Sequence, residues 1–82
     1  MTPGEKIQQA FNNVCKKYDI AKSEILSHKR YPYLVLARME VVAVLRDELG
    51  LSWNHIGRLM SRNHTSIMHL HRKNKTRSYE RV

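Results

Sequence analysis

The sequence has 82 residues, and 15 lysines and arginines against seven acidic residues give it a formal net charge of +8. This length suits one small domain with a modest core, and the single cysteine, Cys15, excludes an intrachain disulfide. Neither a run of 18 apolar residues nor a basic-then-apolar leader is present, so we expect an intracellular protein without a membrane partner.

The positive charge is concentrated in the C-terminal part of the chain. Residues 51–82 hold seven basic residues and one acidic residue, whereas residues 1–50 hold eight basic and six acidic residues. A concentrated positive surface attracts polyanions and releases their counterions on binding. This distribution favours nucleic acid as the partner, although charge alone leaves open a membrane surface or a merely basic, soluble surface.

Helical signals begin at the N-terminus. The stretch TPGE at residues 2–5 has the form of a capping box with proline at the first helical position. Apolar residues then recur at steps of three and four, which predicts a helix over about 3–17. A turn at Asp19 and a short second helix from Lys22 follow.

Pro32 marks the start of a third helix. Residues 33–49 carry apolar side chains at helical spacing, and Gly50 suits the position just after the last turn. The run of β-branched residues within 41–44 favours a strand by propensity. The segment is too long for a strand and no partner strand is visible, so we predict a helix.

Two further helices joined by a tight turn complete the prediction. Ser52 can cap a helix near 53–60, and a fifth helix follows near 64–73. Gly57 lacks a side chain and would let the two helices approach at a steep angle. We therefore predict an all-α fold, a small bundle of about five helices containing a helix–turn–helix, with residues 1–82 as a single domain and a flexible basic tail over 74–82.

Polar side chains at the start of the fifth helix can read base edges. Amide, imidazole and hydroxyl groups match the donors and acceptors that base pairs present in the major groove. The candidate base contacts are Asn63, His64, Thr65 and Ser66. Candidate contacts to the DNA backbone surround them: Arg58, Arg62, His69, Arg72, Lys73, Trp53 and Asn54. Local roles are the alternative, because Asn63 can cap the fifth helix and Trp53 can pack against the preceding helix.

These residues resemble the C-terminal DNA-binding domain of DnaA, the bacterial replication initiator. The stretches SWNHIG at 52–57 and RNHTSIMH at 62–69 are similar to the family forms SLxEIG and GGRDHTTVLH, and the resemblance extends over roughly residues 5–73. It implies base contacts by residues 63–66. It also implies that a basic loop before the third helix reaches the minor groove, with Lys29, Arg30 and, as a third candidate, Arg38.

The sequence departs from the family pattern at several positions. Asn63 replaces an aspartate, and because an amide prefers adenine where an acid prefers cytosine, we expect a different preferred sequence. Met60-Ser61 replace the double glycine of the turn, and Met39-Glu40 align with the family's Arg-Gln. A glycine-rich phosphate loop with its lysine is absent, so we expect no ATPase activity. The chain is either an excised domain or a free-standing small protein, and the initiator methionine followed at once by a capped helix favours the second.

The sequence therefore predicts a sequence-selective binder of double-stranded DNA that acts in transcription regulation or replication control. We expect it in the cytoplasm, at a bacterial nucleoid or in a phage-infected cell, with no enzymatic activity, cofactor, metal or small-molecule substrate. A replication or transcription protein stays open as a partner. The alternatives are an RNA or single-strand binder and a protein-interaction module. A metal-dependent enzyme is disfavoured, because His64, His69 and His71 do not share one helical face.

Overall fold

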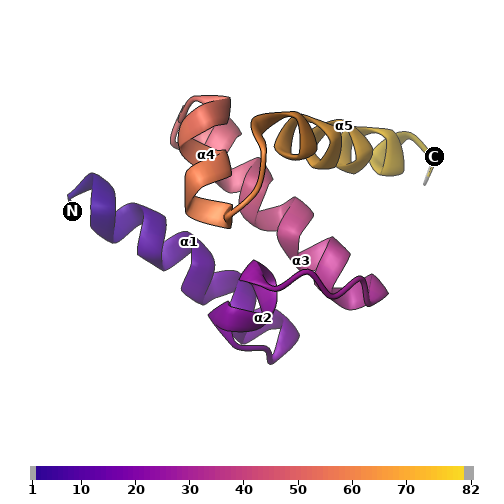
Figure 1. The fold of residues 1–82 in the computed structure, drawn as a ribbon, viewed down its shortest axis with the longest axis horizontal. Coiled ribbons are helices and arrows are strands. Elements are labelled where there is room, and N and C mark those ends of the chain that lie inside the picture. Colours follow the sequence, from indigo (N-terminus) through magenta and orange to yellow (C-terminus); the bar gives the residue numbers. More distant parts are fainter. Residues whose placement is uncertain (1, 81–82) are drawn as a thin grey trace.

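The computed structural model describes the backbone of residues 2–80 and the side chains of residues 2–73. Over residues 2–80 the chain forms five α-helices and a π-helical turn, without a strand: α1 (Pro3–Tyr18), α2 (Lys22–Leu26), α3 (Pro32–Ala43), η1 (Val44–Glu48), α4 (Trp53–Met60) and α5 (His64–Glu80). The predicted all-α bundle is confirmed. In Figure 1, α3 crosses the middle of the molecule, with α1 on one side and α5 on the other.

Local side-chain and backbone signals set the helix ends where the sequence predicted them. The Thr2 hydroxyl accepts a hydrogen bond from the backbone N–H of Glu5 at 3.2 Å, and Pro3 follows it as the first helical residue. The Ser52 hydroxyl caps α4 in the same way, at 3.1 Å from the backbone nitrogen of the third residue after it. Asp19 ends α1 in the left-handed region, with φ at 55°. Each cap satisfies helix-terminal groups that otherwise lack a partner.

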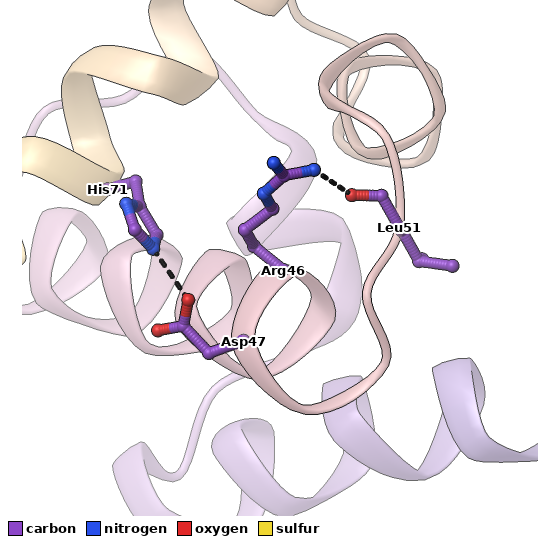
Figure 2. Close-up of polar contacts among 4 residues, drawn as sticks. All are labelled: Arg46, Asp47, Leu51 and His71. Atoms are coloured by element: carbon purple, nitrogen blue, oxygen red, sulfur yellow. Dashed lines mark hydrogen bonds and ion pairs between the residues drawn. The ribbon is translucent and has the colours of Figure 1, made fainter.

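The C-terminal end of the third helical segment differs from the prediction. The sequence pattern indicates one continuous helix to residue 49, but the last turn widens into η1, where the Leu49 N–H donates to the Val44 carbonyl five residues back at 3.1 Å. Gly50 then takes φ of 67°, as its predicted place after the helix requires. The chain turns back so that Arg46 donates to the Leu51 carbonyl at 2.9 Å (Figure 2).

One apolar core joins all the helices. Every helix contributes fully buried side chains to it, among them Phe11, Ile25, Val41, Leu45, Ile56, Met60 and Ile67. Cys15 packs partly against this core, and burial raises the pKa of its thiol, which disfavours the reactive thiolate. None of the helices in residues 2–80 combines the length and the apolar character that crossing a membrane requires.

The fifth helix is longer than predicted. Apolar residues become scarce after Lys73, which predicts the end of the helix there, but α5 continues to Glu80. Neither proline nor glycine follows Gly57 in the sequence, so no residue interrupts the helical backbone. Apolar content thus indicated which part of the helix packs on the core rather than where the helix stops. The side chains of the predicted tail, 74–82, lie outside the described residues.

Candidate nucleic-acid interface

The turn between α4 and α5 depends on a close approach of backbone to Gly57. A Cβ atom at this buried position would lie 2.7 Å from the carbonyl oxygen of Arg62 and 3.4 Å from the backbone nitrogen of His64. The Arg62 N–H donates to the Gly57 carbonyl at 2.8 Å. Ser61 adopts the left-handed conformation, with φ of 56°, that glycine adopts most easily. The missing side chain of Gly57 therefore allows the predicted helix–turn–helix geometry.

The first turn of α5 presents the four predicted base contacts, Asn63 to Ser66, to solvent, and all four are exposed. Ile67 follows directly and is 0% exposed, so it anchors this turn in the core. The Oδ1 atom of Asn63 accepts a hydrogen bond from the Thr65 N–H at 2.9 Å, which confirms the predicted capping role of Asn63. The cap uses one of the two acceptor sites of the amide oxygen, and the NH2 donors are left for a base contact.

Arg38, a predicted minor-groove contact, is buried instead, with 3% of its surface exposed. Its guanidinium donates to four carbonyls in and just after α2: Glu24 at 3.2 Å, Ile25 at 2.8 Å, Ser27 at 2.8 Å and Lys29 at 2.7 Å. Burial lowers the pKa of Arg38, and the nearby charge of Arg62 lowers it further. The minor-groove role predicted for Arg38 is therefore wrong, since its donors are used to shape the loop between α2 and α3.

Arg62 reaches the same loop from the turn before α5. Its guanidinium donates to the Met60 carbonyl at 2.8 Å, to the Ile25 carbonyl at 3.3 Å and to the Ser27 carbonyl. The side chain is half-buried, and this burial lowers its pKa. The geometry gives Arg62 a structural role, and its phosphate contact stays a prediction. We call Arg38 and Arg62 the arginine clamp, because together they tie the α2–α3 loop to α3 and to the start of α5.

A groove of about 650 Å³ lies between the α2–α3 loop and α5. The polar and basic side chains that line it include His28, Arg30, Asn63, Ser66, His69 and Lys73. Among the described residues that line the groove there is no acidic side chain. The groove joins the predicted base contacts to the predicted minor-groove loop in one positive surface. His28 was not predicted to be part of this surface, although its position immediately before Lys29 and Arg30 could have indicated it.

A separate set of contacts fixes α5 against η1 and α4. The Nε2 atom of His71 lies 3.0 Å from Oδ1 of Asp47, as Figure 2 shows. The His71 ring meets the Trp53 ring edge-on, with centroids 5.2 Å apart, and the Arg46 guanidinium carbon lies 4.3 Å from the centroid of the Trp53 ring. Trp53 is thus half-buried and packed between neighbours, which agrees with the alternative prediction that it packs against the preceding helix.

The remaining predicted contacts lie at the surface. All of them are exposed: Asn54, Arg58, His69, Arg72 and Lys73 around the helix–turn–helix, and Lys29 and Arg30 in the α2–α3 loop. Across the described residues, no three histidine, cysteine or acidic side chains are arranged to hold a metal ion. What the site presents is hydrogen-bonding groups flanked by cations, which suits a polyanion with readable polar edges.

Comparison with known proteins identifies the family. The family model of the bacterial DnaA protein helix–turn–helix matches residues 5–73, which is the range over which the resemblance was predicted. The chain belongs to this family. The DnaA helix–turn–helix is a domain that binds double-stranded DNA and is not catalytic.

Individual relatives agree with this assignment. The chain is 39% identical over 57 residues to the chromosomal replication initiator protein DnaA of Thermomicrobium roseum, covering 68% of the chain and 12% of that protein. It is 30% identical over 67 residues to DnaA of Pseudothermotoga lettingae, covering 82% of the chain and 14% of that protein. The chain thus spans only a small part of the length of these relatives. No solved structure gives a significant match.

Proposed function

We propose that this DnaA-type domain binds double-stranded DNA sequence-selectively, with the first turn of α5 in the major groove. The observation that carries the proposal is the exposed polar run 63–66, anchored by the buried Ile67 and continuous with a basic groove whose described lining includes no acidic side chain. A helix N-terminus presented in this way brings side chains to base edges. Buried apolar anchors beneath it hold those side chains at a defined distance from the DNA.

Each side chain of the polar run has a chemistry that base edges can use. His64 offers one donor and one acceptor when neutral, and Thr65 offers a hydroxyl together with a methyl group that fits against a thymine methyl. Asn63 can donate through its amide nitrogen while its oxygen caps the helix. Ser66 faces the basic groove and can contact either a base or a phosphate.

The groove between α5 and the α2–α3 loop lies where the sugar-phosphate backbone of one DNA strand would pass in the proposed complex. A protein that enters the major groove with one element and the adjacent minor groove with another must straddle the phosphates between them. In the proposed complex, Lys29 and Arg30 enter the minor groove, while His69 and Lys73 contact the intervening phosphates. The exposed Asn54, Arg58 and Arg72 contact further phosphates beside the recognition helix.

The proposed biological role is control of replication initiation or of transcription, in the bacterial cytoplasm or nucleoid. The family supports the first of these, since the relatives carry the name of chromosomal replication initiator. We propose that the chain acts without ATPase activity, because its three glycines, Gly4, Gly50 and Gly57, do not form a phosphate-binding loop. A replication or transcription protein is the proposed protein partner.

Selection of bound sequences from a pool of random duplexes tests this function directly. We expect one enriched sequence. On that sequence, Lys73→Ala should make the negative slope of log affinity against log salt shallower by about 0.9, for one lost phosphate contact. Lys16→Ala, which removes the same exposed charge from α1, is the control and should leave the slope unchanged. A pool without enrichment would contradict sequence-selective binding.

A further inference from the structure

Two exposed tyrosines form a stacked pair at the start of α3. The rings of Tyr31 and Tyr33 have centroids 5.9 Å apart and planes 9° from parallel. Their exposed fractions are 54% and 43%, the largest among the described large apolar side chains that are exposed. Aromatic rings favour burial, so an ordered pair left at the surface points to a ligand rather than to the core.

The backbone beneath the pair is held firmly. Tyr31 precedes Pro32, the first residue of α3, and its carbonyl accepts hydrogen bonds from the N–H groups of Leu34 at 2.9 Å and Val35 at 3.0 Å. Leu34 is fully buried and anchors this first turn. The rings are therefore carried on a rigid helix start, so a ligand that stacks on them loses little entropy in ordering the protein.

The surroundings of the pair are positively charged. The exposed Lys29 and Arg30 come immediately before it, and Arg30 also lines the groove that leads to α5. Because Arg30 lines the groove and directly precedes Tyr31, a strand bound in the groove would have the aromatic pair close by. Stacking rings beside a cationic track are the combination that binds single-stranded nucleic acid, because the cations hold the backbone and the rings hold the bases.

We propose that the Tyr31–Tyr33 pair stacks with unpaired bases of a DNA strand that leaves the duplex beside the α2–α3 loop. The inference rests on the proposed duplex-binding function, which defines where the double-stranded part of the DNA lies on the domain. The domain then prefers a junction of duplex and single strand over a continuous duplex. The preference tolerates any base in the single strand, since every base offers a π face.

Binding to a blunt duplex and to the same duplex with a single-stranded oligo(dT) tail tests the proposal. The duplex carries the selected sequence, and tails are placed on either end in turn. We expect one tail position to increase the affinity of the wild type about tenfold, the effect of one stacked base. The double variant Tyr31→Leu/Tyr33→Leu should lose this increase and bind the blunt duplex as before. The matched variant Tyr31→Phe/Tyr33→Phe keeps both rings and should keep the increase.

Equal affinity of the wild type for tailed and blunt duplexes would overturn the proposal, as would equal weakening of both by the leucine variant. A wild type that binds blunt duplex without sequence preference, yet gains affinity from the tail through the rings, would overturn only the duplex-reading function. Photo-cross-linking of a 4-thiothymidine tail to the wild-type protein gives a second test that needs no variant. Adducts on Tyr31 or Tyr33 are expected, and adducts confined to other residues would overturn the proposal.

Discussion

Two groups of cations have opposite environments in the fold. Arg38 and Arg62, the arginine clamp, donate to backbone carbonyls at the end of α2 and in the α2–α3 loop. Lys73 and Arg30 are exposed on the two sides of the groove that the clamp shapes. Positive charge by itself therefore does not identify a DNA contact. In this domain Arg38 and Arg62 build the loop, whereas Arg30 and Lys73 stay exposed beside it.

The largest expected effect on stability comes from removing a guanidinium of the arginine clamp. Arg38→Met should lower the free energy of unfolding by about 3 kcal/mol or more, because four carbonyls in buried or part-buried contacts lose a charged donor. Urea denaturation measures the change. Lys73→Ala, which removes an exposed charge, should stay within about 0.5 kcal/mol of the wild type. Similar losses of stability in the two variants would contradict the distinction.

A smaller effect is expected at the turn that sets the angle of α5. Gly57→Ala should destabilise the fold by about 2 kcal/mol, because the added Cβ meets the Arg62 carbonyl at 2.7 Å and backbone must shift. Gly4→Ala in the first turn of α1 is the matched control. No atom lies within 4 Å of a Cβ there, so we expect a gain of about 0.5 kcal/mol from the lower entropy of the unfolded chain. Thermal unfolding of the two variants separates a steric cost from a general effect of alanine.

The smallest effect is expected where the turn departs from its family. Ser61 holds a left-handed backbone conformation that the double glycine of the family form would adopt without strain. Ser61→Gly should stabilise the domain by about 0.5 kcal/mol, since relief of strain is partly offset by the greater freedom of the unfolded glycine. Asp19→Gly, at the other left-handed non-glycine position of residues 2–80, should behave alike. A loss of stability at Ser61 alone would mean that its side chain has a role in the turn.

The helices and their caps could be predicted because their signals are local. Thr2, Ser52 and Gly50 act within one turn of their own positions, and the spacing of apolar residues identified the helical faces that pack into the core. The exposed run 63–66 followed from the same periodicity together with the family resemblance. These parts of the fold required no knowledge of distant neighbours.

The structural roles of Arg38 and Arg62 could not be predicted in this way. Arg62 donates to carbonyls as many as 37 positions away in the sequence, and helical spacing says nothing about which carbonyls a loop turns inward. The π-helical turn η1 also lacks a sequence signal of its own, because the apolar pattern continues through it. Where a role depends on tertiary contact, the periodicity of one segment does not reveal it.

The most direct test of base reading by α5 compares His64→Ala with Lys73→Ala on two duplexes, the selected sequence and a scrambled one. His64→Ala should lose about 1–3 kcal/mol of binding free energy on the selected duplex and almost none on the scrambled duplex. Lys73→Ala should weaken both duplexes similarly, because phosphates carry no sequence. If His64→Ala weakened both duplexes equally, the first turn of α5 would not read bases.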